Sequence, residues 1–307
     1  MSDNLQRLNY YTQNKYSELQ NVIEIIVPEN LKTFRRNEIY FYQGPNSIKP
    51  DDVVGSYGDY NHGWWWGNND GMPLNIQCFS ISADGINNNE YPSIQKVRKI
   101  MSNNNNAFLF PLEYGRHWND AFDMMNNRVK KVNWEHKKDE PVFRGTLTGT
   151  EKIDRLDFCK LFSSKYNVGL LYNPYQYTEL DYKDCTKDSV SINNMLKYKY
   201  IISIEGNDKD SGLNWKLASG SVVLMKKPVY ESWLMEGRLI PYFHYVPLKD
   251  DYSDFEEILN WCKNNDSKCK EISSNAFNYM LEFNNLQNEK KLANEIKNFY
   301  SNHYKFE

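Results

Sequence analysis

The sequence lacks both a long apolar run and a recognisable N-terminal leader. No stretch of its 307 residues reaches the ~18 apolar residues expected of a membrane-spanning helix. The opening segment, MSDNLQRLNYY, has no positively charged lead and no apolar core, so it does not fit a signal peptide. These absences predict a cytoplasmic protein with no membrane span.

Cysteine is scarce, and its pattern fits no metal or redox motif. The five cysteines are odd in number and scattered along the chain (Cys78, Cys159, Cys185, Cys262 and Cys269). Cys262 and Cys269 lie closest together, but their spacing fits neither a zinc knuckle nor a CxxC redox pair. The five histidines are also too far apart for a zinc site. We therefore expect free thiols, no structural disulfide and no bound metal.

Positive charge is not in excess, and this bears on the partner. The formal net charge is −3, whereas proteins that bind a nucleic-acid backbone usually carry a basic surface. Nucleic acid is therefore not the expected partner, although a local basic pocket for a diphosphate is compatible with this charge. Aromatic residues are abundant, with 15 Phe, 8 Trp and 23 Tyr. Tyr and Trp suit carbohydrate binding because they combine an apolar ring with a polar group, but an AT-rich genome would favour the same Tyr-, Asn- and Lys-rich composition.

The first part of the chain has irregular spacing between its apolar segments. Its periodicity predicts strands and helices over the following ranges: strands over 38–43, 76–81 and 107–110, and helices over 4–22 and 119–133. The charged run 135–140 is the best candidate for a domain boundary.

From residue 141 onward, strand and helix patterns alternate. Strands are expected near 142–145, 168–172, 199–204 and 221–225, and helices near 154–165, 190–197, 212–219, 253–264 and 269–282. Such alternation predicts an α/β fold with a parallel sheet that is covered on both faces. A last helix is expected over about 287–303.

A polar turn separates two of these strands, the apolar runs 200–204 and 221–225. The turn is Glu205-Gly206-Asn207-Asp208, and a segment typical of a short helix follows it over 212–218. Open α/β sheets bind ligands at the carboxyl ends of their strands, where this turn would lie. A nucleotide or another phosphorylated ligand is the natural candidate. An ordinary buried sheet would explain the apolar runs but not the polar groups between them.

Five ordered segments resemble a known family. They are FRGTLTG (143–149) with Arg155 after it, KYIISIEGND (199–208), NWKLASGSVVLM (214–225), ESWLMEGRLIPYFHYVPL (231–248) and DDYSDFEE (250–257). They are similar to glycosyltransferase family 90, which contains capsule-associated proteins, lipopolysaccharide-modifying enzymes and protein O-glucosyltransferases. The similarity covers roughly residues 140–275 and is weak over the first 135 residues.

The resemblance implies the GT-B architecture, in which two Rossmann-like domains have a cleft between them. It divides the chain into an N-terminal acceptor-side domain (1–137), a nucleotide-sugar-binding domain (138–284) and a C-terminal helix (285–307). It also implies a UDP-sugar donor carrying glucose or xylose, a glycan or glycoprotein acceptor, and an inverting reaction that needs no metal. The protein O-glucosyltransferases enter the secretory pathway, and this chain shows no signal for it, so a microbial or viral origin is expected.

The first phosphate-binding segment would begin at Arg144, near the end of an expected strand, and continue through Gly145 and Thr146. Small residues there let backbone N–H groups approach a phosphate, and the guanidinium supplies a forked donor. A structural turn with a surface arginine would look the same. Arg155, one turn into the next helix, could face the same ligand or be a solvated charge. The segment is no P-loop, because it lacks the GK[ST] ending.

A second donor-binding segment follows the polar turn. Asn214 and Lys216 lie on a short helix whose N-terminus could stabilise the departing diphosphate, with an exposed helical lysine as the alternative. Glu205 and Glu231 could each bind a ribose or sugar hydroxyl. The predicted nucleotide-sugar site is completed by neighbours in the same two segments, namely Gly206, Asn207 and Ser221.

Two further features leave alternatives open. Asp208 and Asp210 form a DxD pattern that could hold Mn²⁺ or Mg²⁺ in a metal-dependent GT-A transferase, although such pairs are common in loops. His244, between aromatic residues, could contact the sugar or act as an acid or base, since its unperturbed pKa is near neutrality. A packed, hydrogen-bonded histidine is the other interpretation.

The acceptor side must supply a base that takes the proton of the attacking hydroxyl. Members of the family use an aspartate upstream of a strand that resembles 76–82. Asp59, in an Asp-Tyr pair, is favoured over Asp70, which could equally belong to a turn. Three adjacent tryptophans beside them suit sugar stacking (Trp64, Trp65 and Trp66). Together these features predict a glycosyltransferase; the rival is a non-catalytic sugar- or nucleotide-binding module of the same fold.

Overall fold

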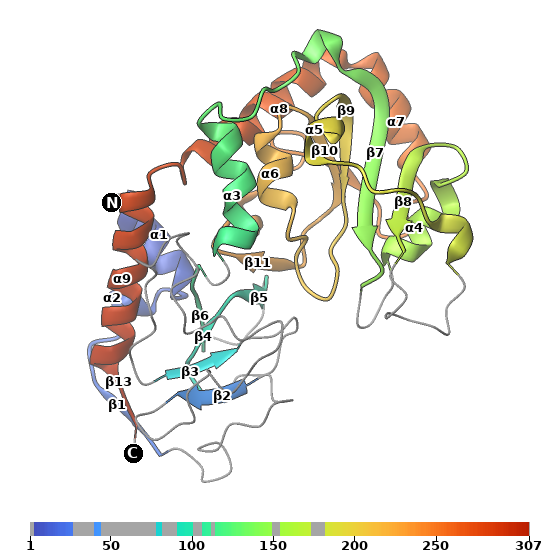
Figure 1. The fold of residues 1–307 in the computed structure, drawn as a ribbon. Coiled ribbons are helices and arrows are strands. Elements are labelled where there is room, and N and C mark those ends of the chain that lie inside the picture. Colours follow the sequence, from blue (N-terminus) through green and yellow to red (C-terminus); the bar gives the residue numbers. More distant parts are fainter. Residues whose placement is uncertain are drawn as a thin grey trace. The chain divides into compact units, whose positions relative to one another are not determined.

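The computed structural model describes most of the chain as two compact units (Figure 1). The described residues are 3–26, 40–43, 78–81, 91–100, 106–111, 114–148, 154–172 and 182–306. Unit 1 comprises Met1–Arg116, Tyr230–Met235 and Asn285–Glu307, and unit 2 comprises His117–Val229 and Glu236–Asn284. These units differ from the domains expected from the sequence in that the chain returns twice to unit 1 after residue 229.

A five-stranded parallel sheet forms the centre of unit 2. Its strands lie in the order β12-β10-β9-β7-β8. Their bounds are Lys138–Thr146 for β7, Asn167–Leu171 for β8, Tyr198–Ser203 for β9, Val222–Lys226 for β10 and Val246–Leu248 for β12. In register, Val142 lies opposite Ile201 on one side and Asn167 on the other, and Leu224 lies between Ile202 and Val246. The predicted parallel α/β sheet is thereby confirmed, and β12 is an additional strand that the pattern did not predict.

The central strands β9 and β10 consist mainly of apolar residues because both faces of the sheet are buried there. Tyr200, Ile202 and Leu224 pack with α4 (Asp154–Phe162), α7 (Phe255–Asn264) and the first half of α8 (Asp266–Leu281) in one apolar core. The alternate residues Ile201 and Val223 point to the opposite face and are also fully buried. Burial on both faces accounts for continuous apolar runs rather than a two-residue alternation.

Further helices of unit 2 lie before or between its strands. They are most of α3 (Tyr114–Met125), α5 (Ile192–Met195) and α6 (Leu213–Ala218), with 3-10 turns at Trp134–His136, Lys183–Cys185 and Glu236–Arg238. The expected helix over 119–133 is wrong in its bounds. The chain leaves the helix after Met125, and Asn127 takes a left-handed φ of 56°, which an α-helix cannot continue through.

Unit 1 combines small sheets with helices from both ends of the chain. The strands are β1 (Ile23–Ile25), β2 (Tyr40–Gln43), β3 (Cys78–Ile81), β4 (Ser93–Gln95), β5 (Val97–Lys99), β6 (Ala107–Leu109), β11 (Tyr230–Ser232) and β13 (Tyr304–Phe306). They form a mixed sheet in the order β2-β3-β4-β6 and two strand pairs, β5 with β11 and β1 with β13. The helices are α1 (Asp3–Tyr11), α2 (Lys15–Glu18) and α9 (Leu286–His303).

The N-terminal helix is shorter than the sequence pattern indicates. The expected helix over 4–22 is wrong, because Gln13 and Asn14 adopt left-handed φ angles of 52° and 67° and divide it into α1 and α2. α1 is held to α9 by a buried ion pair in which Arg7 donates to Glu289 at 2.6 Å. The expected final helix near 287–303 is confirmed as α9.

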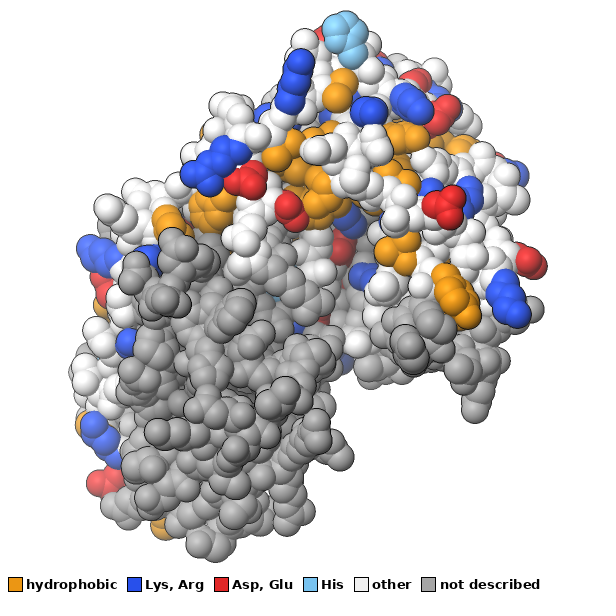
Figure 2. Space-filling view, in the orientation of Figure 1, with side chains coloured by type: hydrophobic (Ala, Val, Ile, Leu, Met, Phe, Trp, Pro, Cys, Tyr) orange, Lys and Arg blue, Asp and Glu red, His pale blue; other side chains and the backbone are white. Residues whose placement is uncertain are grey.

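The described surface carries charges of both signs. On the face shown in Figure 2, Lys and Arg side chains lie interspersed with Asp and Glu side chains. Among the helices that the structure describes, none is both long and apolar enough to cross a membrane.

Candidate functional site

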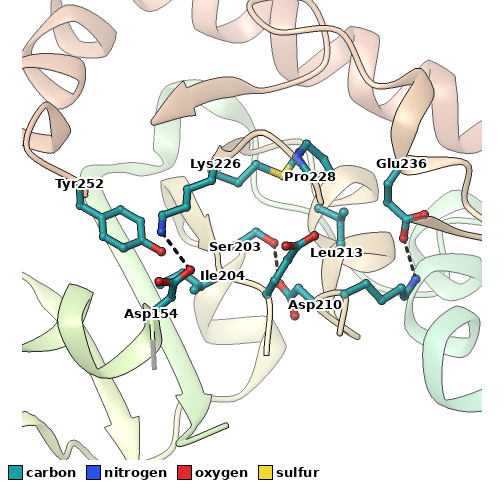
Figure 3. A pocket seen from close by; sticks show the side chains of 12 residues that line it. Asp154, Ser203, Ile204, Asp210, Leu213, Lys226, Pro228, Glu236 and Tyr252 are labelled. Carbon is teal, nitrogen blue, oxygen red and sulfur yellow. Dashed lines mark hydrogen bonds and ion pairs between the residues drawn. The ribbon is translucent and has the colours of Figure 1, made fainter. Parts of the chain in front are cut away.

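A small polar pocket lies in unit 2 at the carboxyl ends of β9 and β10 (Figure 3). The residues that matter most for its chemistry are Asp154, Ser203, Glu205, Asp210, Lys226 and Tyr252. Its enclosed space is about 30 Å³, which accommodates only a few water-sized groups. The pocket, whose polar lining forms its floor, therefore has no room by itself for a whole nucleotide. Its position at the carboxyl edge of a parallel sheet is where α/β proteins bind ligands.

Asp210 is the most heavily bonded side chain of this floor. Its carboxylate accepts a hydrogen bond from the Ser203 hydroxyl at 2.6 Å and from the Gly212 N–H at 2.9 Å. It also forms a buried ion pair with Lys216, whose ammonium group donates a further bond to the carbonyl of Ile202 at 3.0 Å. Burial acts to raise the pKa of Asp210, but the charges of Lys216 and Arg155, together with the hydrogen bonds from Lys216 and Ser203, outweigh it and lower the pKa to about 2. Asp210 is therefore an ionised structural anchor of the turn.

A second ion pair lies beside the first. The Lys209 ammonium contacts Glu236 at 3.1 Å, and both residues are almost fully buried. Lys209 also donates to Oδ1 of Asn214 at 3.1 Å. The amide nitrogen of Asn214 is buried and has no hydrogen-bond partner among the described residues. The side-chain amide of Asn214 therefore has a buried N–H donor that no described residue accepts, although Asn214 does not line the pocket.

The opposite wall of the pocket is formed by residues from three different segments. Lys226, the last residue of β10, donates to Asp154 at the start of α4 at 2.9 Å. Its ammonium group also lies 4.2 Å from the centre of the Tyr252 ring, within the range of a cation–π contact. Tyr252 lies in the segment after β12. Because β12 is the neighbour of β10 in the sheet, this segment comes close to the end of β10 and the start of α4.

Arg155 holds the polar turn against the end of β7. Its guanidinium donates to the carbonyl of Ile204 at 3.0 and 3.2 Å, to the carbonyl of Thr146 at 3.1 Å and to the hydroxyl of Thr148 at 2.9 Å. All four bonds go to uncharged oxygens, so among the described residues its charge is not neutralised by a bonded carboxylate. Gly206 passes close by, because a Cβ there would lie 2.5 Å from Oγ1 of Thr148 and 3.2 Å from Nη2 of Arg155.

Glu205 and Asn207 flank Gly206 in the turn. Both are partly exposed, and Glu205 lines the pocket. One Glu205 carboxylate oxygen accepts a hydrogen bond from the backbone N–H of Val229 at 3.1 Å. This bond fixes the carboxylate at the pocket, as the sequence-based hypothesis of a hydroxyl-binding group requires.

Arg144 does not point into this pocket. Its guanidinium donates to the carbonyl of Asp188 at 2.7 Å and to the carbonyl and side-chain oxygen of Asn167 at 3.0 and 2.8 Å. Asn167 begins β8, so the side chain leans toward the amino end of the neighbouring parallel strand. Gly145, the next residue, lies under the Phe143 ring, where a Cβ would come within 2.8 Å of the ring. The structure therefore brings Arg155 and Thr146 together at the carboxyl edge and places Arg144 elsewhere.

The remaining sequence-based candidates lie at other positions. Ser221 is fully buried at the start of β10, donates to the Tyr198 carbonyl at 2.7 Å and accepts from Lys137 at 2.8 Å. This is the amino edge of the sheet, opposite to the pocket. Glu231 belongs to unit 1, where it pairs with Arg98 at 2.6 Å.

His244 has the environment of a packed histidine. Its Nδ1 accepts a hydrogen bond from the Ile240 N–H at 2.9 Å, and its ring centre lies 5.1 Å from that of Tyr279. Burial, assisted by the charge of Arg238, lowers the pKa of His244 and favours the neutral ring. His244 does not line the pocket.

The candidates for the catalytic base and for sugar stacking lie outside the described residues: Asp59, Asp70, Trp64, Trp65 and Trp66. Among the residues that the structure does describe, no group of three or more His, Cys, Asp or Glu side chains could hold a metal ion. The DxD alternative is further weakened by the contacts of Asp210, whose carboxylate is already used by Ser203, Gly212 and Lys216.

Several pocket residues were not among the sequence-based candidates. They are Asp154, Lys209, Lys226, Glu236 and Tyr252. Lys226 could have been found, because it ends an apolar strand at the same edge as Glu205. Tyr252 belongs to the DDYSDFEE segment, but the spacing of residues in that segment does not indicate that the Tyr252 ring reaches β9 and β10.

Comparisons with known proteins agree with the sequence resemblance. The profile of the family described as "Glycosyl transferase family 90" matches residues 112–301. The O-glucosyltransferase LpsA of Dichelobacter nodosus is 33% identical over 219 residues, which are 69% of this chain and 63% of that protein.

Two further relatives come from an invertebrate virus and an animal. Protein 179R of Invertebrate iridescent virus 6 is 42% identical over 89 residues, 27% of this chain and 8% of the viral protein. The O-glucosyltransferase rumi of Drosophila melanogaster is 25% identical over 57% of this chain and 43% of that protein. The chain thus spans less than two thirds of the length of each of these relatives.

Proposed function

The chain belongs to glycosyl transferase family 90, and we propose that it transfers a sugar from a nucleotide diphosphate sugar to a hydroxyl group of a glycan or protein. Glucose is the first candidate for the transferred sugar, because relatives in bacteria and animals are named O-glucosyltransferases. Xylose is the second candidate. A UDP donor, a GT-B arrangement of two domains and inversion at the anomeric carbon belong to the same proposal.

The observation that carries the proposal is the buried guanidinium of Arg155 beside the Gly206 turn. Its hydrogen bonds with described residues go to carbonyl and hydroxyl oxygens only. A diphosphate that approached the turn would meet a cation that forms no ion pair with a carboxylate of the described residues, although its charge also acts on Asp210. Gly206 supports this assignment, because the absence of a side chain lets the turn lie directly against Thr148 and the Arg155 guanidinium.

The proposed reaction is a displacement at the anomeric carbon. The acceptor hydroxyl oxygen forms a bond to that carbon while the bond from the carbon to the diphosphate oxygen breaks, and UDP leaves with the electron pair. The hydroxyl proton passes to a carboxylate of the chain, for which Asp59 is the first candidate and Asp70 the second. Arg155 stabilises the negative charge that develops on the leaving diphosphate.

Metal independence is also part of the proposal. A DxD motif would need the Asp210 carboxylate to bind a cation, but that carboxylate bonds to Lys216, Ser203 and Gly212. Opening these contacts would leave the Lys216 ammonium buried without its partner, which is costly. A reducing, cytoplasmic setting is a further part of the proposal, supported by four buried free cysteines.

Ligand-dependent stabilisation tests donor binding. The protein would be unfolded by heat with UDP, UDP-glucose, UDP-xylose or ADP, each with and without EDTA. A nucleotide at a hundred times its Kd stabilises a protein by about 2.7 kcal/mol, so UDP compounds should raise the Tm and ADP should not. Loss of the UDP effect on adding EDTA would contradict metal independence.

Transfer assays separate an enzyme from a binding module. Wild type, Asp59→Asn and Asp70→Asn would be compared for release of UDP from UDP-glucose in the presence of glycan acceptors. We expect Asp59→Asn to bind the donor and to lose transfer. Donor binding by the wild type without transfer or hydrolysis would favour the non-catalytic module.

A further inference from the structure

The hydroxyl of Tyr252 is a buried polar group without a hydrogen bond to any part of the chain that the structure describes. The residue is 2% exposed, and its hydroxyl oxygen has no hydrogen-bond partner among the described residues. The ring belongs to the pocket lining, and Figure 3 shows its hydroxyl end turned toward the space between Asp154 and Lys226. A phenylalanine would fill the same volume without burying an unpaired hydroxyl, which typically costs about 1–3 kcal/mol.

The backbone at Tyr252 is also strained. Its φ is 58°, in the left-handed region that bulky residues rarely adopt. The turn that imposes this φ is held by its own hydrogen bonds: the Tyr252 N–H donates to the Lys249 carbonyl at 3.1 Å, and the Lys249 N–H donates to the Asp254 carboxylate at 3.0 Å. Strain at a residue whose polar end faces a pocket is typical of functional positions.

The ring is held in place from two sides. Its edge-to-face contact with Phe158 has a centroid distance of 5.0 Å, and the Lys226 ammonium lies 4.2 Å from its centre. Lys226 is fixed in turn by its ion pair with Asp154 at 2.9 Å. The hydroxyl therefore has a defined position before any ligand binds.

The surroundings of the hydroxyl select the kind of ligand group it can bind. Burial and the nearby carboxylates of Asp154, Glu205 and Asp157 raise the pKa of Tyr252, so the phenol keeps its proton. The same carboxylates repel a phosphate but accept hydrogen bonds from hydroxyl groups. The pocket's space of about 30 Å³ also suits a hydroxyl rather than a phosphate.

We propose that Tyr252 is a donor-recognition residue whose hydroxyl forms a hydrogen bond with a sugar hydroxyl of the nucleotide sugar. The inference rests on the proposed function, because it takes a nucleotide sugar as the ligand. The hydroxyl belongs either to the ribose or to the transferred sugar. Both are the same chemical group, and the choice between them is open to experiment.

The test is Tyr252→Phe, with Tyr245→Phe as its matched control. Tyr245 is also fully buried in unit 2, and its hydroxyl has no partner among the described residues, but it does not line the pocket. Calorimetry would give the Kd of UDP and of UDP-glucose for the wild type and both variants. Losing one hydrogen bond of ordinary strength should weaken donor binding by roughly 5- to 10-fold in Tyr252→Phe. Tyr245→Phe should bind like the wild type.

The ligand that responds identifies the contact. Weaker binding of both UDP and UDP-glucose places the bond on the ribose, and weaker binding of UDP-glucose alone places it on the transferred sugar. Equal affinities in Tyr252→Phe and the wild type overturn the inference and leave the proposed function intact. A Tm of Tyr252→Phe well below that of the wild type also overturns it, since the hydroxyl would then have a partner in the free protein. Failure of the wild type to bind either compound counts against the proposed function itself.

Discussion

Among the described residues, the lysines in and under the pocket form ion pairs with carboxylates, whereas Arg155 forms none. Lys209 contacts Glu236, and Lys226 contacts Asp154. Because paired lysines contribute little net charge, they position the turn and the pocket walls more than they attract a diphosphate. Arg155 is therefore the residue on which the positive potential of the site depends.

Replacing Arg155 should reduce donor binding and transfer. We expect Arg155→Ala to weaken UDP binding at least tenfold and to slow transfer by about a hundredfold, the usual effect of removing one preorganised donor. Arg144→Ala is the matched control, because it also removes a hydrogen-bonded guanidinium near β7, but one that bonds to Asp188 and Asn167 rather than to the turn after β9. Calorimetry with UDP would contradict the assignment if Arg144→Ala loses affinity and Arg155→Ala does not.

The buried pair of Asp210 and Lys216 should make stability depend on pH in acid. The pKa of Asp210 is lowered from 3.8 to about 2, so its ionisation stabilises the folded state above pH 3.8. That contribution, on the order of 2 kcal/mol, is lost as the pH falls from 3.8 through about 2. Urea unfolding at several pH values would measure it.

A double variant supplies the control for this pH dependence. Replacing the pair by apolar residues, Asp210→Leu with Lys216→Met, removes the titrating group without leaving a buried charge, and such replacements are often near neutral in stability. Its free energy of unfolding should fall less steeply than that of the wild type below pH 4. Asp210→Leu alone should lose about 3–5 kcal/mol, since Lys216 would remain buried and unpaired. Identical pH slopes for the wild type and the double variant would contradict the role of the pair.

At the scale of elements, the segment between β9 and α6 is the part of unit 2 most closely fitted to the pocket. Its backbone passes Arg155 and Thr148 so closely that only glycine fits at position 206. The N–H of Gly206 also donates to the carbonyl of Asp208 at 2.9 Å, which closes the turn on itself. The turn is therefore compact before a ligand arrives, and a side chain added to it would displace the Arg155 guanidinium.

A pair of glycine variants tests this fit. Gly206→Ala would place a Cβ 2.5 Å from Thr148 Oγ1, so Arg155 or the turn must move, and UDP affinity should fall. Gly220→Ala is the control: Gly220 has a φ of 68° with no atom near a new Cβ, so the change should cost roughly 1 kcal/mol of stability through backbone strain. Tm and UDP affinity would be measured together. The fit is contradicted if Gly206→Ala binds UDP as tightly as Gly220→Ala does.

The alternation of strands and helices in unit 2 could be predicted because each strand is a buried apolar run with turn residues on both sides. β12 was missed because it has only three residues and contains Pro247. The polar turn 205–208 was found from the rule that ligands bind at strand ends. The sequence could not show that Arg144 points away from the pocket, because the direction of its side chain depends on the register of β7 with β8. Tyr252 could not be found, since it reaches the pocket only through the strand order β12-β10-β9.

At the scale of the whole molecule, four of the five cysteines are core residues. Cys159, Cys185, Cys262 and Cys269 are buried and free. Burial first, and then the neighbouring Cys185, raise the pKa of Cys159 to about 12. The pKa of Cys262 is also raised, first by a hydrogen bond with Cys269 and then by burial. These thiols fill the apolar core between the sheet and α4, α7 and α8, and unfolding is required to expose them.

Alkylation without reductant should therefore label the cysteines only after unfolding. A pKa of about 12 instead of the usual 9 reduces the thiolate population of Cys159 at neutral pH by about a thousandfold, in addition to its steric protection. We expect mass spectrometry to find the four buried thiols unmodified after brief treatment of the native protein with iodoacetamide. All five cysteines should be modified once denaturant is added. A reduced sample treated in parallel gives the full extent of labelling.

The pair in which a disulfide would form most readily is Cys262 on α7 and Cys269 on α8, because the Cys269 thiol lies 3.6 Å from the Cys262 carbonyl. A disulfide-linked peptide containing both residues, recovered from the unreduced protein, would contradict the assignment of free thiols and remove the support that they give to a reducing environment.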